Sequence, residues 1–235
     1  MNNTLLDLGT EEKKKAIDAL IEHSSPQLPF FFMALLSVLM TTFGILKGNS
    51  AVVIGGALIA PLLYPILSLS MGIVMTDQNL LNRSLNTLIR ASLYGLAVSF
   101  LLATLFKLEG GNSTNSQLTL LTSPSLLDAA IAVIAGLAVS FATVKSALNE
   151  ALPGVAIAVT LVPPLSAIGV GLANFDWNIA STAFVTLALN VVGIVLTSVT
   201  VFSLMNFHTM RKEADRVIRE EEREFEKVTI GNTTR

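Results

Sequence analysis

Long apolar runs alternate with short polar and charged segments along the chain. No Asp, Glu, Lys or Arg lies within residues 24–46, 48–76, 151–175 or 177–210. A bilayer core about 30 Å thick needs about 20 apolar residues in a helix, so each of these runs is long enough to cross it. The pattern therefore predicts an all-α polytopic membrane protein.

Hydropathy and helix-length rules together give six transmembrane helices, at about residues 28–46, 51–75, 87–106, 126–144, 152–173 and 180–206. They form a six-span domain over residues 28–206. A cytoplasmic amphipathic segment, residues 1–27, precedes this domain, and a cytoplasmic charged helix, residues 207–235, follows it. With this order of spans, all Lys and Arg residues except Lys47 and Lys107 fall on the side of the termini, 13 of 15. Because basic residues are retained on the inner side, we expect a multi-pass inner (plasma) membrane protein with both termini cytoplasmic.

Two proline pairs interrupt this apolar pattern at related positions. Residues 59–68 read IAPLLYPILS, and shifting the chain by 102 residues places Pro61 on Pro163 within TLVPPLSAIG. Each pair lies in the second span of a three-span half, about 28–106 and 126–206. Three spans per half reverse the entry side of the second half, so the sequence predicts an inverted repeat. Proline inside a helix costs roughly 3 kcal/mol, and we therefore expect helices two and five to be broken.

The interrupted helices indicate a candidate substrate pathway. Membrane helices also tolerate proline as a simple kink, but two breaks at matching positions favour a site near the midplane. The candidate residues share an uncharged polar or proline character; they are Pro61, Tyr64, Pro65, Ser68, Thr160, Pro163, Pro164 and Ser166, with Thr186 and Asn190 lining the pathway. Such a lining suits a neutral solute, an ion held by carbonyls, or an anion at half-helix N-termini.

Polar and small residues recur at helical spacing on several spans. A stripe on span six comprises Thr182, Thr186, Asn190, Gly193, Thr197, Thr200 and Ser203. It is typical either of hydrogen bonds between helices or of one wall of a polar conduit, and the length of the stripe favours the conduit slightly. Small residues at Ala91, Gly95, Ser99 and Ala103, and at Ala132, Gly136 and Ser140, predict close helix packing without chemistry of their own.

Charged residues near the membrane boundary have two readings each. Lys145 and Glu150 flank span five, either as interfacial anchors or as a gate or coupling pair.

The segments before and after the six spans are also interpreted from their patterns. One helical face of the N-terminal segment is apolar and comprises Ala16, Ile17, Leu20 and Ile21, which predicts a helix lying on the inner membrane surface. The charged segment after residue 210 is either a solvated extension of span six or a helical contact with another subunit.

Several function classes are disfavoured by what the sequence lacks. It contains no cysteine, no HExxH or GxSxG motif and no P-loop, so we expect no enzyme activity, no cofactor and no metal site. Nothing in the charge pattern indicates nucleic-acid binding. The expected partners are the lipid bilayer, further copies of the chain in a homo-oligomer, and a small solute or ion.

With these residues in view, the stretches SAVVIGGALIAPLLYPI and NEALPGVAIAVTLVPPLSAIGVGLA resemble the two signature segments of the domain of unknown function 389 family. The resemblance covers roughly residues 30–205 and implies a hydrophobic membrane fold, but it implies no activity. Our sequence-based interpretation is a channel or secondary transporter whose site lies between the proline-broken helices. The alternative is a membrane scaffold or sensor that acts through its cytoplasmic ends.

Overall fold

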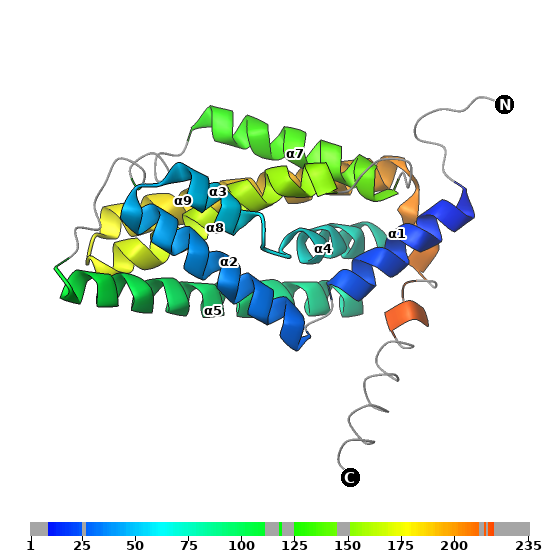
Figure 1. The fold of residues 1–235 in the computed structure, drawn as a ribbon. Helices are drawn as coiled ribbons and strands as arrows, with labels where there is room; N and C mark the ends of the chain where they lie inside the picture. The colour runs from blue at the N-terminus through cyan, green and yellow to red at the C-terminus, as the bar shows by residue number, and fades with distance from the viewer. Residues whose placement is uncertain are drawn as a thin grey trace, which may run out of the picture.

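The computed structural model describes residues 9–24, 27–110, 118, 125–144, 151–211, 214 and 216–218, with the backbone alone at Thr10, His23 and 151–159. Within these residues the chain is helical and contains no β-strand (Figure 1). The helices are α1 (Thr10–His23), α2 (Leu28–Lys47), α3 (Ser50–Ala57), α4 (Leu63–Met75), α5 (Gln78–Leu108), α7 (Leu126–Val144), α8 (Ala151–Ala173), α9 (Trp177–Leu204) and the 3₁₀ helix η1 (Phe207–Met210).

Four helices of the described chain, α2, α5, α7 and α9, are long and apolar enough to cross a membrane. The second predicted span is divided between α3 and α4, which are separated by residues 58–62. The third predicted span is extended, because α5 begins at Gln78 rather than near residue 87 and has 31 residues. Its N-terminal portion carries Arg83, which the prediction placed before the span, and Arg90, which the prediction placed near the start of the span.

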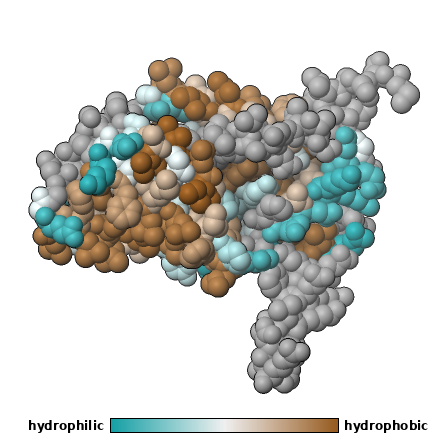
Figure 2. Space-filling model, in the orientation of Figure 1, coloured by the Kyte–Doolittle hydropathy of each residue, from teal (hydrophilic) through white to brown (hydrophobic). Residues whose placement is uncertain are grey.

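The surface of the bundle is apolar and its interior holds many hydroxyl groups. Large apolar side chains stand exposed along the four long helices, among them Phe32, Leu101, Ile134 and Leu196. On the face seen in Figure 2, apolar residues predominate along the bundle, whereas hydrophilic residues gather at the end that carries α1 and in smaller patches at the opposite end. Hydroxyl residues such as Ser37, Thr41, Ser99, Ser140 and Ser198 are completely buried. This reversal of the soluble pattern is typical of a protein whose outer surface faces lipid.

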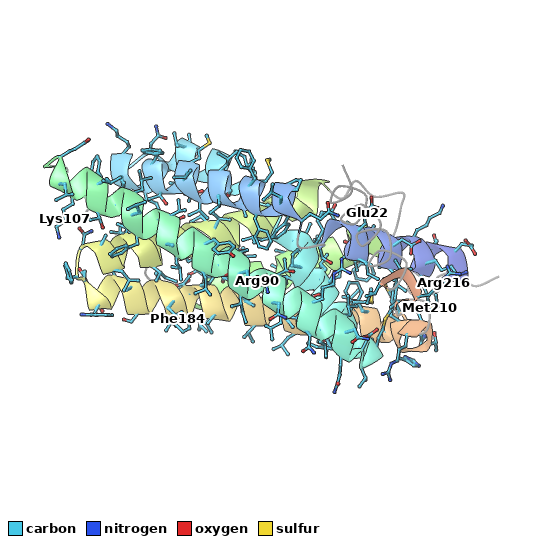
Figure 3. All side chains as sticks on the ribbon, turned by 90° about the horizontal axis from the view of Figure 1, so that it is seen from below. Glu22, Arg90, Lys107, Phe184, Met210 and Arg216 are labelled. Atoms are coloured by element: carbon cyan, nitrogen blue, oxygen red, sulfur yellow. The ribbon has the colours of Figure 1, made fainter. Side chains whose placement is uncertain are left out.

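Labelled charges in Figure 3 also lie mainly at the two ends of the bundle. Lys107 lies at one end, and Glu22 and Arg216 lie at the other. Arg90 is an exposed side chain partway along α5. A long arginine side chain at such a position reaches toward the interface while its stem stays in apolar surroundings.

Three helix pairs are joined by the same tight turn. In each, the residue just before the next helix donates its N–H to a glycine carbonyl five residues earlier: Asn49 to Gly44 at 2.9 Å, Asp77 to Gly72 at 3.0 Å and Asp176 to Gly171 at 3.0 Å. The residue before it has a positive φ, in Gly48 (65°), Thr76 (53°) and Phe175 (57°). This is the Schellman arrangement, which closes the C-terminal turn of a helix.

The same turn starts the next helix. The side chains of Asn49, Asp77 and Asp176 each accept two backbone N–H groups and so cap α3, α5 and α9. The glycine of each turn lies against the following helix: a Cβ on Gly44 would come within 2.6 Å of the Val53 nitrogen. The turns therefore hold α2–α3, α4–α5 and α8–α9 as closely packed hairpins.

Both stripes of small residues are buried at helix contacts, which confirms their predicted packing role. Ala91, Gly95, Ser99 and Ala103 form the buried face of α5, and a Cβ on Gly169 of α8 would lie 2.6 Å from the Ser99 Cβ. On α7, Gly136 lies against Ile194 of α9. Small side chains let these helix backbones approach closely.

The apolar face of α1 does not remain available to lipid. Ala16, Ile17, Leu20 and Ile21 are buried at 2% exposure or less in one core cluster with residues of α4, α9 and η1. The prediction that this face lies on the membrane surface is therefore wrong. The amphipathic pattern is satisfied by protein instead, because α1 packs on α4, α7 and η1 at one end of the bundle (Figure 1).

The C-terminal part contributes to the same cluster. Ala214 and Ile218 are buried, and Met210 and Val217 pack against the core. Lys13 of α1 donates through Nζ to the Asn206 carbonyl at 3.5 Å and lies 5.9 Å from the centre of the Phe207 ring. Two segments from opposite ends of the sequence thus pack together against α4 and α9.

Candidate functional site

The helix break between α3 and α4 lies where the first proline pair predicts it. After Ala57, the N–H groups of Ile59 and Ala60 donate to the carbonyls of Gly56 and Ala57 at 3.2 Å, which tightens the end of α3. Pro61 follows in the non-helical segment 58–62. Pro65 falls in the first turn of α4, where a helix has no internal use for the N–H that proline lacks.

Residues of α2 support the end of α3. The Ser37 hydroxyl donates to the Gly56 carbonyl at 2.8 Å, which supplies a further partner at the helix end. Gly56 also lies so close to α2 that a Cβ there would meet the Thr41 nitrogen at 2.6 Å. The Thr41 Oγ1 is buried and has no hydrogen-bond partner. The break is therefore enclosed by protein on this side.

The second proline pair does not break its helix, and the prediction of an interrupted fifth span is wrong. Helix α8 runs continuously from Ala151 to Ala173 with Pro163 and Pro164 inside it. Pro164 cannot donate to the carbonyl of Thr160, four residues earlier. That carbonyl instead accepts a hydrogen bond from Asn190 Nδ2 of α9 at 2.7 Å. A neighbouring helix thus replaces one missing bond of the ladder.

A second hydroxyl supports α8 just beyond the prolines. Ser99 of α5 donates to the Ser166 carbonyl at 2.7 Å, and Ser99 is also the residue packed against Gly169. The Ser166 hydroxyl is itself completely buried and lacks a hydrogen-bond partner. Residues 160–166 of α8, which include Pro163 and Pro164, form the proline step of this helix. The step is held from two sides, by α9 and by α5.

Two candidate residues on α4 have separate surroundings. Ser68 donates to the Leu20 carbonyl at 2.9 Å and so binds α1 rather than the proline step of α8. Tyr64, partly buried at the start of α4, packs against the main core cluster. Of the ten pathway candidates, the structure joins Asn190 and Thr160 directly, and it places Ser68 in the contact with α1.

The polar stripe of span six is divided. Its threonine hydroxyls at 182, 186, 197 and 200 each donate to a carbonyl of α9 four residues earlier. Thr186, Asn190 and Thr197 are buried, whereas Thr200 and Ser203 are exposed. The central part of the stripe therefore faces protein, and the final part does not.

Two of the predicted residues lie outside the part of the chain that the structure describes. Lys145 and Glu150, the proposed gate or coupling pair, are outside the described residues. Among the residues that are described, no group of His, Cys, Asp or Glu is arranged to hold a metal ion.

Sequence reasoning missed the bonding role of Ser99, which it assigned to packing alone. It also counted Ser37 and Thr41 only among the polar groups that accompany the breaks and did not assign them to the pathway, although they stand four residues apart on one face of α2. A hydroxyl pair at that spacing in an otherwise apolar helix was the available signal. The identity of the carbonyls that such hydroxyls bind depends on the tertiary structure.

Comparison with known proteins identifies the family of the chain. The family model described as a domain of unknown function (DUF389) matches residues 57–196, which include both proline pairs. An uncharacterized protein of Methanocaldococcus jannaschii is 30% identical over 172 residues, covering 73% of this chain and 52% of the relative. The chain thus spans about half the length of the curated relative it matches. No solved structure matches it significantly. With its apolar membrane-length helices and its two proline-bearing segments, the chain belongs to the domain of unknown function 389 family.

Proposed function

We propose that the protein is a channel or secondary transporter for a small solute or ion, with its passage beside the break between α3 and α4. The observation that carries this proposal is a helix that stops midway along a membrane-length segment. Residues 58–62 leave the helical ladder between Ser50 and Met75. In hydrocarbon each unsatisfied backbone group costs several kcal/mol, so such backbone is tolerated only inside protein or beside a cavity.

The arrangement of the helices supports the inverted repeat that this proposal assumes. In each half the second span leads into the third through the same Schellman turn, at Thr76 and at Phe175. Across the halves, α4 contacts α9 and α5 contacts α8. The second span of one half therefore packs on the third span of the other, as a two-fold relation requires.

A proline kink alone does not explain the break between α3 and α4. A proline kink removes one hydrogen bond and leaves the helix continuous, as in α8, whereas the α3–α4 segment stops and restarts. The two prolines of each pair, Tyr64 and the Asn190–Thr160 contact lie near the middle of their spans. We place the pathway there, with Thr186 and Ser166 beside it, and expect the protein to act as a homo-oligomer without enzyme activity.

Solute flux into proteoliposomes tests the proposal. The full chain is reconstituted, and uptake is measured for neutral solutes by light scattering and for ions by flux assays. The combined variant Pro61→Ala and Asn190→Leu should lose most of the flux of the unchanged protein. Thr200→Val, on the exposed part of α9, is the matched control and should retain it. Unchanged flux in the combined variant, with normal folding by circular dichroism, would remove this placement of the pathway.

A second candidate function is a scaffold or sensor that acts through the ends of the chain. It is favoured by the packing of α1 and of Ala214 and Ile218 in the core cluster that includes α4. Deleting residues 219–235, which leaves the buried Ala214 and Ile218 in place, separates the two candidates. A transporter should retain its flux after this deletion, whereas a scaffold should lose a partner that co-purifies with the full chain.

A further inference from the structure

Asn190 presents a buried oxygen that the contacts of the bundle leave unused. It is the fourteenth of the 28 residues of α9 and is 3% exposed. Its Nδ2 group donates to the Thr160 carbonyl at 2.7 Å. The orientation of the amide is fixed by this bond, because an oxygen in place of Nδ2 would repel the carbonyl. Oδ1 therefore lies on the other side and has no hydrogen-bond partner.

A buried amide oxygen without a partner requires a physical reason. Most buried polar side-chain atoms in proteins are hydrogen-bonded, and an exception often marks a bound ion or water. Simple replacement of the missing ladder bond explains Nδ2 alone.

Two further oxygen acceptors belong to the proline-bearing part of α8 and to the preceding turn of α9. Pro163 has no N–H, so it cannot donate to the carbonyl of Val159 four residues earlier in α8. Thr186 lies one turn before Asn190 on the same face of α9, and its hydroxyl hydrogen is used by the Thr182 carbonyl at 3.0 Å. Its oxygen retains lone pairs that can accept. The Ser166 hydroxyl just beyond the prolines, which also lacks a hydrogen-bond partner, carries lone pairs that can accept in the same way.

A set of neutral oxygen acceptors is complementary to a cation of low charge. Carbonyl and amide oxygens replace the hydration shell of monovalent ions, whereas divalent ions are generally bound with carboxylates. Within the described side chains of α8 and α9 the acidic residue is Asp176, which is already used as the N-cap of α9. The chemistry therefore favours a monovalent cation over Ca²⁺ or Mg²⁺.

We propose that a small monovalent cation binds between the proline-bearing part of α8 and the middle of α9. Asn190 Oδ1 is one ligand, and the Val159 carbonyl and the Thr186 oxygen are further ligands. This inference rests on the proposed transport function and assigns that function a permeant or coupling cation. Binding itself can be measured without transport.

The binding test uses the purified full chain in detergent. Thermal unfolding is followed by circular dichroism in NaCl, in KCl and in choline chloride at equal ionic strength. At an Na⁺ concentration roughly tenfold above Kd, the midpoint should rise by about 3–6 °C over choline chloride. Asn190→Leu should abolish this rise measured against its own choline baseline. Pro163→Ala, which supplies an N–H to the Val159 carbonyl, should reduce it.

Thr197→Val is the matched control, because Thr197 is buried on the same helix and donates to the Gly193 carbonyl instead. It should keep the full Na⁺-dependent rise. Equal midpoints in NaCl, KCl and choline chloride would overturn the proposal and leave a buried water as the partner of Oδ1, and a rise that persists in Asn190→Leu would overturn it as well. A cation-dependent rise without any flux would instead refute transport and leave the cation site standing.

Discussion

The hydrogen bond from Asn190 to the Thr160 carbonyl should contribute little to stability once Pro164 is replaced by alanine. The perturbation is Asn190→Leu, made in the unchanged chain and again in the Pro164→Ala variant. In the unchanged chain the Thr160 carbonyl loses the donor that replaces its missing ladder bond. In Pro164→Ala, the N–H of the new alanine lies four residues from that carbonyl and closes the helix without Asn190.

The size of the effect follows from the geometry. A bond of 2.7 Å between a buried amide and a carbonyl is well made. Leaving the buried carbonyl without a donor costs about 1–3 kcal/mol. Hydrogen bonds between membrane helices measure about 0.6–2 kcal/mol, because partners are also found in the unfolded state. Asn190→Leu also removes the unpartnered Oδ1, which recovers part of the loss. We therefore expect a cost of about 1–2 kcal/mol in the unchanged chain and less than about 0.5 kcal/mol beside Pro164→Ala.

Thermal unfolding in detergent without added Na⁺ or K⁺ measures this coupling. A chain of this length loses about 2–4 °C per kcal/mol, so Asn190→Leu should lower the midpoint by about 2–8 °C. The same substitution should lower it by less than about 2 °C in Pro164→Ala. Thr197→Val should cost the same in both backgrounds, since its hydroxyl bonds Gly193. Equal losses for Asn190→Leu in both backgrounds would refute the view that this side chain replaces the ladder bond.

Three further substitutions test other parts of the structure. Gly169→Val adds a side chain at a position where even a Cβ atom would lie 2.6 Å from the Ser99 Cβ. We therefore expect at least about 2 kcal/mol of destabilisation and poor recovery of folded protein by gel filtration. Ser68→Ala removes the donor to the Leu20 carbonyl, which should cost about 1 kcal/mol and speed protease cleavage within α1, while cleavage elsewhere is unchanged. Thr76→Gly relieves a φ of 53° and should raise stability by about 0.5–1 kcal/mol, and a fall in the unfolding midpoint would contradict the turn assignment.

The positions of the helices could be predicted because they depend on local properties of the chain. Charge-free runs and small-residue stripes are read directly from the sequence, and most of the described helices follow them, although α5 begins at Gln78 rather than near residue 87. The break at Pro61 was also predictable, because Pro61 has no N–H to donate to the carbonyl of Ala57, four residues earlier at the end of α3.

The fate of the second proline pair could not be read in the same way. Whether α8 breaks depends on Asn190, which is 30 positions from Thr160 in the chain and faces it only after α8 and α9 have packed. The docking of α1 has a similar origin. An amphipathic pattern predicts that Ile17 and Leu20 are removed from water. It does not distinguish burial in lipid from burial against protein, because either environment removes these side chains from water.

The three Schellman turns also bear on how the protein is made. Two-residue connections at Gly48–Asn49 and Thr76–Asp77, and a three-residue connection at 174–176, leave almost no polar chain between the helices they join. A helix pair closed in this way has no loop to be threaded through the bilayer after its first arm. We expect such a pair to enter the membrane as one hairpin, so that insertion of the chain proceeds by hairpins rather than by single helices.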